Sequence, residues 1–311
     1  MLPPGHSSRP ATMADAEAIL ALVSAYNERV IGRADTTLDQ IRTDLAEPGF
    51  APETDSWLVH GPDGALLGYG WAYHKGAGQV QVDVIAEPPA VDFLFARVLA
   101  RADEMAPGGV VDMGFYRADD ALRAAAERHG FAPATAFHRM RIDHDGDADP
   151  PIAPRGVTLR SGRQVAAAAH AVLVESFEDH FGWVGKPFAD WQTALDDNPV
   201  FDWPGLTVAE LDGTPVGVLL TNREFVEDED CGYVADLGVL KEARGRGIAG
   251  FLLRTAFAAD RAAGLRGTIL HVDTNNTTPA LSLYENAGMR PVLVIDAWRR
   301  APHPFGGPDH P

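Results

Sequence analysis

The chain has 311 residues, of which 46% are hydrophobic and 23% charged, a composition within the ordinary range of globular proteins. Its length predicts two domains. With 44 acidic and 26 basic residues the formal net charge is −18, which disfavours nucleic acid as a partner and favours a cationic one. The single cysteine excludes an internal disulfide, and no apolar run reaches the length of a signal peptide or a membrane span. We therefore expect a cytoplasmic protein without a membrane partner.

The two halves of the chain repeat the same order of expected elements. In each half a helical region is followed by a hairpin, a strand, a long helix, another strand, a short helix and a final strand. The hairpin at 57–73 is echoed at 206–220, and the segment 126–131 is echoed at 284–289. This repeat predicts two copies of one α/β unit, each with a mixed sheet.

A polar, proline-rich stretch near the midpoint separates the two repeats. We predict a first domain over residues 1–145, a linker over 146–156 and a second domain over 157–300. The last residues, 301–311, hold four prolines and two glycines and are expected to form a loose tail.

The turn between the expected strand at 232–240 and the long helix at 247–263 indicates phosphate binding. It contains two glycines that alternate with two arginines, from Arg244 to Gly247. Unpaired N–H groups at a helix start bind phosphate, glycines allow close approach of the backbone, and arginines add charge-assisted hydrogen bonds. The simpler alternative is an ordinary strand-to-helix turn with solvated arginines.

The same glycines also fit the dinucleotide-binding pattern G-x-G-x-x-G. Gly245, Gly247 and Gly250 have that spacing, and Asp273 stands where a ribose-binding acid would. Four residues separate the strand from the first glycine, however, and too few residues follow Asp273 to complete a doubly wound sheet. A dinucleotide-dependent oxidoreductase is therefore the less favoured alternative.

Two motifs of this half occur together. The loop from Arg244 to Ala249 reads R-x-x-G-x-A, and Asn276 and the segment Leu-Tyr-Glu-Asn-Ala-Gly-Met at 283–289 follow it. They resemble the phosphate loop, the Asn before a helix and the L-Y-E-x-x-G-F pattern of the GNAT acetyltransferase superfamily, with Met in place of Phe. The tandem layout, from Arg9 to about Arg300, resembles the mycothiol synthases and related actinobacterial two-domain acetyltransferases.

The resemblance implies a fold and a co-substrate. The fold is expected to be α/β with a mixed sheet, in two tandem GNAT-like acyl-CoA N-acyltransferase domains, and the co-substrate acetyl-CoA, with no metal. In the first repeat the counterpart of the loop reads Ala-Glu-Pro-Pro-Ala at 86–90, and Ala126 stands in place of Tyr284, so we expect that domain not to catalyse. The residues implied to bind acetyl-CoA are Leu237, Gly238, Val239, Arg244, Gly245, Arg246, Gly247, Ile248, Ala249 and Asn276.

Acyl transfer from a thioester to an amine requires a neutral amine, a donor for the developing oxyanion and an acid for the leaving thiolate. We predict Tyr284 as the acid, because a phenol can donate a proton to a thiolate. The resemblance implies a Glu eleven residues before Arg244, but Tyr233 stands there. Asp236 is the nearest carboxylate and our candidate base or substrate anchor, although regular alternation would place it opposite Tyr233 unless a bulge intervenes. Further candidates for the base are Glu224 and His271.

The segment 176–191 is rich in aromatic residues and is broken by Gly and Pro. The resemblance implies that this region walls the acceptor site, so we assign Trp183 or His180 to substrate contact rather than to core packing. The acidic run 224–230 is typical of a solvated hairpin loop, with steering of a cationic acceptor as the alternative. The histidines lack metal-ligand spacing.

These residues predict an acetyl-CoA-dependent N-acetyltransferase. It would pass the acetyl group directly to the amine of a small, cationic molecule within a ternary complex. The alternative from another class is a non-catalytic acyl-CoA or metabolite-binding protein that has kept the phosphate loop without an efficient base.

Overall fold

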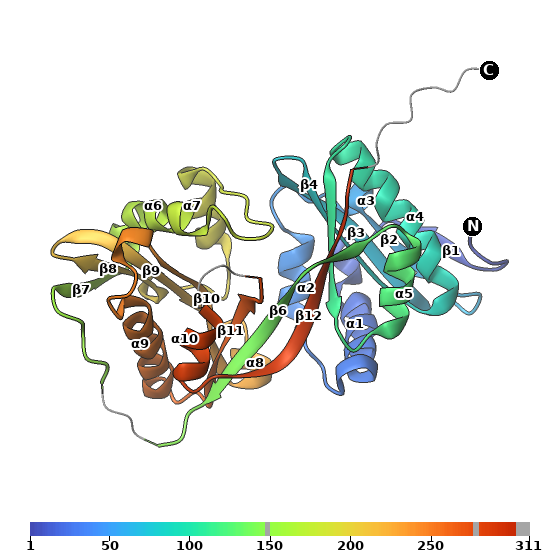
Figure 1. The fold of residues 1–311 in the computed structure, drawn as a ribbon. Helices are drawn as coiled ribbons and strands as arrows, with labels where there is room; N and C mark the ends of the chain where they lie inside the picture. The colour runs from blue at the N-terminus through green and yellow to red at the C-terminus, as the bar shows by residue number, and fades with distance from the viewer. Residues whose placement is uncertain (147–149, 276–279, 303–311) are drawn as a thin grey trace. The chain divides into compact units, whose positions relative to one another are not determined.

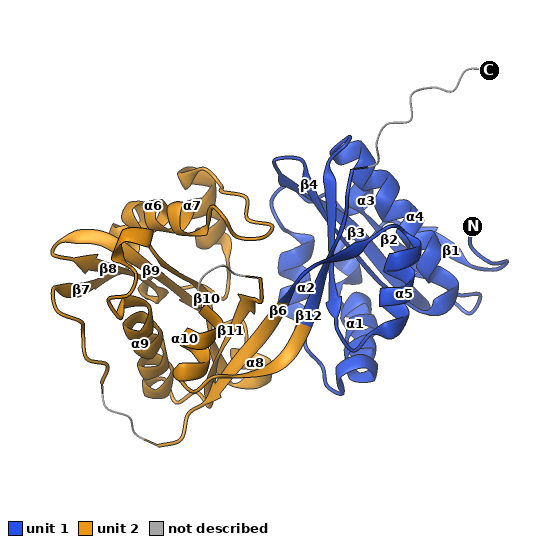
Figure 2. Cartoon of the chain, in the orientation of Figure 1, with its two compact units in different colours: residues 1–136, 295–311 blue, residues 137–294 orange. Residues whose placement is uncertain are grey.

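The structure, a computed structural model, describes residues 1–146, 150–275 and 280–302. The chain forms two compact units, which Figure 2 shows in separate colours. Unit 1 comprises residues 1–136 and the chain from 295 onward, and unit 2 comprises residues 137–294. Each unit has a mixed sheet with helices on both faces (Figure 1), which confirms the α/β fold class.

Unit 1 follows the order of elements expected for one repeat. Its first long helix forms because apolar residues recur every three or four positions, at Ile19, Val23 and Tyr26, and it ends at Gly32 in a left-handed conformation. The elements are β1 (Ser7–Arg9), α1 (Ala16–Ile31), α2 (Leu38–Leu45), α3 (Pro52–Asp55), β2 (Ser56–His60), β3 (Leu66–Gly76), β4 (Gln79–Ala86), α4 (Pro88–Met105), β5 (Val110–Tyr116), α5 (Asp120–Arg128) and the start of β6 (Ala132–Asp143).

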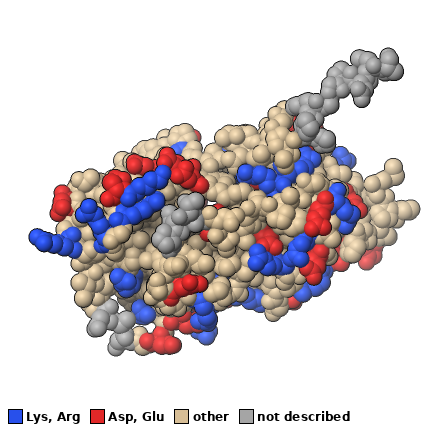
Figure 3. Space-filling model, viewed as in Figure 1, with Lys and Arg blue, Asp and Glu red and all other residues tan. Residues whose placement is uncertain are grey.

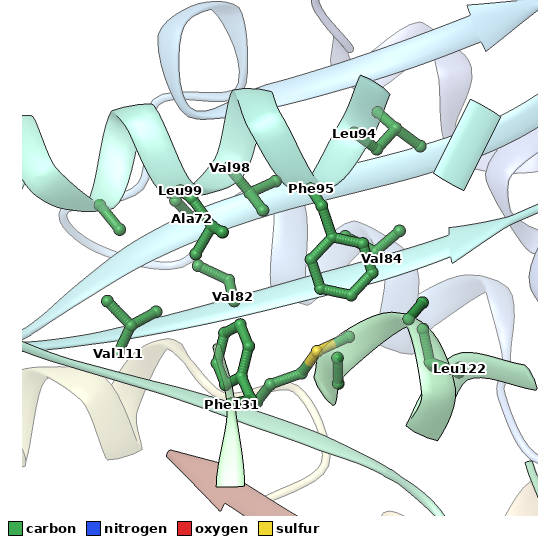
Figure 4. Close-up of a cluster of buried hydrophobic side chains, with 14 of the residues drawn as sticks. Ala72, Val82, Val84, Leu94, Phe95, Val98, Leu99, Val111, Leu122 and Phe131 are labelled. Carbon is green, nitrogen blue, oxygen red and sulfur yellow. The ribbon is translucent and has the colours of Figure 1, made fainter. Parts of the chain in front are cut away.

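The sheet of unit 1 has the order β1-β2-β3-β4-β5-β12. Strands β1 to β4 are antiparallel neighbours, β4 and β5 are parallel, and β12 (Arg290–Arg300) runs antiparallel to β5. Val82 and Val84 alternate along β4 and pack against Leu94, Phe95 and Val98 of α4 (Figure 4). Each fully buried side chain of this kind contributes about 1.5–3 kcal/mol. Helices α1 and α2 pack in a second apolar cluster with β2 and β3.

Unit 2 contains the corresponding elements of the second repeat. They are β7 (Val157–Ser161), α6 (Ala166–Phe177), α7 (Phe188–Asp197), β8 (Leu206–Leu211), β9 (Thr214–Asn222), α8 (Val226–Glu229), β10 (Cys231–Val239), α9 (Ile248–Ala262), β11 (Gly267–Asp273) and α10 (Ala280–Asn286). The sheet order is β6-β11-β10-β9-β8-β7, in which β10 and β11 are parallel and the other neighbours antiparallel. Helices α9 and α10 pack in one apolar cluster of this unit, and α6 and α7 in another.

The same close contacts occur within each unit at matching positions. A side chain at Gly68 of β3 would collide with Leu94 of α4, and one at Gly217 of β9 would press on Leu252 of α9. At the ends of α5 and α10, Phe131 donates its backbone N–H to Ala126 and Met289 donates to Tyr284, both at 3.0 Å. The sequence repeat therefore corresponds to a structural repeat.

The compact units differ from the continuous halves expected from the sequence. The last strand of each half crosses from one unit to the other, as the colour change along β6 and β12 in Figure 2 shows. Residues 137–143 of β6 pair with β11 in unit 2, and residues 295–300 of β12 pair with β5 in unit 1. The predicted boundary at 145 counts β6 in the first domain, whereas in the structure this strand lies between β12 and β11. Residues 147–149 of the expected linker and 303–311 of the expected tail lie outside the described residues.

Candidate active site

The two parallel strands of unit 2 pair only along their first halves. Residues Cys231–Val234 of β10 pair with Gly267–Leu270 of β11, and the pairing ends there although both strands continue. On its other side β10 stays paired with β9 as far as Val239. Alternate peptide groups of β10 beyond Val234 therefore face a gap in the sheet, where a ligand can complete their hydrogen bonds.

A cavity of about 590 Å³ opens at this gap. Most residues predicted to bind the co-substrate line it, and they come from β10, the glycine turn and the start of α9: Leu237, Gly238, Val239, Arg244, Gly245, Gly247, Ile248 and Ala249. Tyr284 lines it too. Arg246 is exposed and is not among the lining residues, and Asn276 lies outside the described residues.

The glycine turn is built to leave the start of α9 open. Gly245 and Gly247 have φ values of 76° and 77°, in the left-handed region that side chains disfavour. Gly247 is the N-cap residue, and no side chain among the described residues caps the helix. The first N–H groups of α9 therefore face the cavity without an acceptor, as an anion site requires. The Arg244 side chain braces the turn, because its Nε donates to the carbonyl of Val239 at 3.0 Å.

Gly238 allows helix α6 to lie against the cavity end of β10. A Cβ atom at this position would overlap the Ser176 hydroxyl and press on the Phe177 ring at 3.1 Å. The Ser176 hydroxyl itself donates to the carbonyl of Leu173. The glycine is thus needed for close packing beside the gap.

Tyr284 is placed by the short helix α10, with 8% of its surface exposed. Burial raises the pKa of its phenol to about 12, so the hydroxyl stays protonated at neutral pH. None of the described residues forms a hydrogen bond with this hydroxyl. The phenol can therefore donate to a group that enters the cavity.

A bulge at Ala235 brings Tyr233 and Asp236 to the same face of β10. Tyr233 lies opposite Asn222 and Asp236 opposite Leu220, two positions that share a face of β9, because the register shifts between Val234 and Asp236. The bulge that Asp236 needs to share a face with Tyr233 is therefore present. Burial raises the pKa of Asp236 to about 6, so this carboxylate is ionised at pH 7 yet more basic than an ordinary aspartate. Tyr233 lines the cavity, whereas Asp236 is not among the lining residues.

Tyr233 belongs to a chain of buried polar side chains. Its hydroxyl lies 3.1 Å from Nδ1 of His271, and Arg139 donates from Nε to Nε2 of the same ring at 3.2 Å. Because Nε2 accepts, Nδ1 carries the ring proton and donates to Tyr233, which leaves the tyrosine proton available for another acceptor. Burial, reinforced by the carboxylates of Glu224 and Asp236, raises the pKa of Tyr233 well above its usual value, so its phenol is no base at neutral pH.

Arg139 and Phe137, which were not predicted as site residues, belong to the part of β6 that lies in unit 2. The only available signal was a pair of arginines at alternating positions of an expected strand, and the order of the chain assigned that strand to the first domain. The expectation of a solvated acidic loop at 224–230 is also wrong in part. The Glu229 side chain is only 6% exposed, and it pairs with Arg139 at 3.4 Å and with Arg141 at 2.6 Å.

Aromatic residues from the segment between α6 and α7 form another wall of the cavity. His180 and Trp183, the two predicted here, both line it, and the Phe177 ring lies 4.3 Å from the His180 ring and 5.2 Å from the Trp183 ring. Phe137 of β6 faces Phe181 at 6.5 Å. The wall is apolar, with few charges to hold water in place.

Many basic side chains of the chain form ion pairs. On the face shown in Figure 3, basic side chains lie beside acidic ones. At the base of the glycine turn, Lys241 lies 3.1 Å from Asp179 and 3.3 Å from Glu178. Within the described ranges, no group of three or more His, Cys, Asp or Glu side chains could hold a metal ion. Over the same ranges, no helix is both long and apolar enough to cross a membrane.

Comparison with known proteins assigns the family. A family model described as the acetyltransferase (GNAT) family matches residues 170–289. The mycothiol acetyltransferase of Streptomyces griseus is 30% identical over 236 residues, which cover 73% of this chain and 74% of that protein. A solved GCN5-related N-acetyltransferase from Sphaerobacter thermophilus is 25% identical, with a TM-score of 0.81 over 98% of both chains. A tandem GNAT protein from the clavulanic acid biosynthesis pathway is 17% identical, with a TM-score of 0.74 over 97% of this chain and 100% of that one.

The mixed sheet, with parallel strands that part over a cavity beside an uncapped helix start, is the fold that this chain shares with the solved N-acetyltransferases. The chain belongs to the GNAT acetyltransferase family and is an N-acetyltransferase with a tandem architecture. The dinucleotide interpretation of the glycines is wrong, because β10 and β11 are the parallel pair in the described sheet of unit 2, whereas a doubly wound sheet is parallel almost throughout.

Proposed function

We propose that unit 2 transfers an acetyl group from acetyl-CoA to the amine of a small molecule. The observation that carries this proposal is a single cavity lined jointly by the glycine turn, the unpaired part of β10 and Tyr284. An anion site, a row of peptide groups and a phenolic donor are the three elements that binding and cleaving a CoA thioester require.

The donor would bind along β10 with its pyrophosphate at the start of α9. The free N–H groups of Ile248 and Ala249 would donate hydrogen bonds to the phosphate oxygens, and Arg246 would add charge from the turn. Peptide groups between Leu237 and Val239 that face the gap would pair with the pantetheine arm and polarise the thioester carbonyl.

Tyr284 would protonate the leaving group. As the amine nitrogen bonds to the carbonyl carbon, the carbon–sulfur bond breaks and the electron pair goes to sulfur. With a pKa of about 12 the phenol is protonated at neutral pH, so it would donate a hydrogen bond to sulfur as negative charge develops there and would supply the proton of the departing thiol. The site is largely apolar, which strengthens that donation.

Asp236 would attract the acceptor and take its proton. Freeing the lone pair of a lysine-like amine at pH 7 costs about 4.6 kcal/mol, which a nearby base can offset. A partly buried carboxylate with a pKa of about 6 binds an ammonium ion and is basic enough to relay a proton through water. The Tyr233 hydroxyl, held by His271, would donate a hydrogen bond to the same acceptor.

The surroundings of Cys231 favour direct transfer of the acetyl group to the amine over transfer through the cysteine. Cys231 is buried, its thiol donates to the carbonyl of Glu229, and burial raises its pKa to about 11. It is not among the residues that line the cavity. A thiol in this state is a poor nucleophile, so an acetyl-cysteine intermediate is disfavoured and a ternary complex favoured.

The test is thiol release from acetyl-CoA across a panel of small amines, with mass detection of the N-acetylated product. We expect release that depends on the amine and falls strongly in the Tyr284→Phe variant. Binding of acetyl-CoA by calorimetry, with no thiol release for any amine, would favour the non-catalytic alternative. Binding of NAD without binding of CoA would reject the proposal altogether.

A further inference from the structure

Unit 1 contains a cavity at the position that corresponds to the active site of unit 2. Residues Gln79–Val82 of β4 pair in parallel with Val110–Met113 of β5, and the pairing ends there although both strands continue. A cavity of about 270 Å³ lies beside this gap. We refer to it as the unit 1 cavity.

The entrance to this gap is unsuited to a CoA pyrophosphate. The N-cap residue of α4 is Glu87, and the first two helical residues are Pro88 and Pro89. Prolines have no N–H to donate, and the Glu87 carboxylate repels phosphate. Glu87 is paired with Arg29 at 2.6 Å, so the pair has no net charge and this arginine offers no free cation to a phosphate.

The walls of the unit 1 cavity are aromatic and acidic. Five aromatic side chains and two carboxylates line it, and no Lys, Arg or His is among the described lining residues. The Tyr26 and Tyr116 rings stack 6.2 Å apart. The aromatic residues are Tyr26, Tyr69, Trp71, Phe115 and Tyr116, and the carboxylates are Asp44 and Asp83. Aromatic faces and carboxylates together attract a cation.

Asp83 is the better buried of the two carboxylates. Its Oδ1 accepts a hydrogen bond from the backbone N–H of Val84 at 2.7 Å. Burial raises its pKa to about 7, and the charge of Asp44 adds to the effect. Two like charges beside one apolar cavity repel each other, and a cation between them would relieve both the repulsion and the burial of charge.

Asn27 supplies an independent sign of a missing ligand. Only 2% of this residue is exposed, it lines the unit 1 cavity, and its Nδ2 has no acceptor among the described residues. A buried amide N–H without an acceptor is destabilising, and in native proteins such a group almost always has a partner. The expected partner is an oxygen of a bound molecule.

We propose that the unit 1 cavity binds a small primary amine that has an apolar or aromatic body and an oxygen acceptor. The ammonium group would lie between Asp83 and Asp44, the body would pack against the tyrosine rings, and the oxygen would accept from Asn27. The volume of about 270 Å³ suits a molecule of this size and not a cofactor. The inference is independent of the function proposed for unit 2.

Calorimetry on the full chain tests this site, with tyramine as the probe. Its amine, ring and hydroxyl match the three elements of the cavity. 4-Ethylphenol lacks only the amine and phenethylamine only the hydroxyl. We expect the Asp83→Asn variant to bind tyramine about tenfold or more weakly than the wild type, and the wild type to bind 4-ethylphenol more weakly to a similar extent. Phenethylamine should bind a few-fold more weakly than tyramine.

The matched control is Asp39→Asn, which also removes one negative charge. The Asp39 side chain lies on α2, is 66% exposed and does not line the cavity. This variant should bind tyramine as the wild type does. If Asp83→Asn does not fold, as judged by circular dichroism, Asp44→Asn makes the same test with the same expected loss. Undetectable binding of tyramine to the wild type, equal binding of 4-ethylphenol, or equal loss in Asp39→Asn would each overturn the proposal.

Discussion

The turns that precede α4 and α9 occupy the same place in the two repeats and differ in almost every chemical respect. Before α9 the chain has Gly247 in a left-handed conformation, an uncapped helix start and two arginines. Before α4 it has Glu87 followed by Pro88 and Pro89, which removes two N–H donors and adds a negative charge. One helix start invites an anion and the other repels it.

The gaps between parallel strands differ in the same way. In unit 2 the cavity at the gap includes Tyr284, while in unit 1 the matching position at the end of α5 is Ala126, which is fully buried. The unit 1 cavity has carboxylates and an unpaired amide instead. The fold therefore opens the same gap twice, and the side chains around each gap decide what it can bind.

The largest expected effect follows loss of the Tyr284 phenol, the proposed acid, which has no counterpart in unit 1. Tyr284→Phe should lower kcat about a hundredfold to ten-thousandfold and leave KM for acetyl-CoA within a few-fold, because the phenol acts mainly as charge develops on sulfur. Steady-state kinetics measure this. Tyr73→Phe, which removes the hydroxyl of a half-buried tyrosine in unit 1 that lines neither cavity, is the control and should leave turnover unchanged. A normal kcat in Tyr284→Phe, with a lowered Tm, would make Tyr284 a core residue only.

The next effect concerns the base. If Asp236 accepts the proton, its carboxylate must be ionised, so wild-type kcat should fall as the pH drops through about 6. Asp236→Asn should lower kcat about a hundredfold and abolish that limb of the profile. A pH profile at saturating amine and acetyl-CoA measures both. The same limb in the variant would exclude Asp236 as the base and direct attention to Glu224 or His271.

A smaller effect is expected in the glycine turn. Arg246→Glu should weaken acetyl-CoA binding by about 1–3 kcal/mol, through loss of charge-assisted bonds to phosphate. Arg97→Glu makes the same charge change on the exposed side of α4 in unit 1 and should leave binding unchanged. Calorimetry with acetyl-CoA compares the two variants. Equal acetyl-CoA affinities of the two variants would show that Arg246 does not bind the phosphates.

The smallest effect is on stability and depends on pH. Burial holds the pKa of Asp83 at about 7, above the value of about 3.9 in an unfolded chain, so its contribution to stability is lost as the pH rises toward and through 7. An asparagine carries no such penalty. Asp83→Asn should therefore raise the free energy of unfolding on the order of 1–3 kcal/mol at pH 8 and change it little at pH 4. Urea unfolding at both pH values checks the sign, and a loss of stability at pH 8 would contradict it.

The local parts of this site could be predicted from the sequence. The glycines and arginines at 244–247 are contiguous, and the φ values that only glycine tolerates well are a property of single residues. The repeat was visible because the same contacts need the same residue types, as at Gly68 and Gly217. The fold class follows from that order of elements.

The non-local parts could not be predicted. The bulge at Ala235 depends on the register between β10 and β9, which alternation within one strand does not specify. The exchange of β6 and β12 depends on which sheet edge each strand joins, and the arginine that orients His271 came from a strand counted in the other domain. Asp236 and Tyr233 share a face for a reason that lies outside their own segment.

A crystal structure grown with acetyl-CoA tests the central claim most directly, since the claim is that one gap of the two binds this donor. We predict electron density for one acetyl-CoA per chain, with its pyrophosphate at the start of α9, its arm along residues 235–239 of β10 and its sulfur within hydrogen-bond reach of the Tyr284 hydroxyl. Density at the start of α4 instead, or an α9 site that stays empty at saturating acetyl-CoA, would contradict the account.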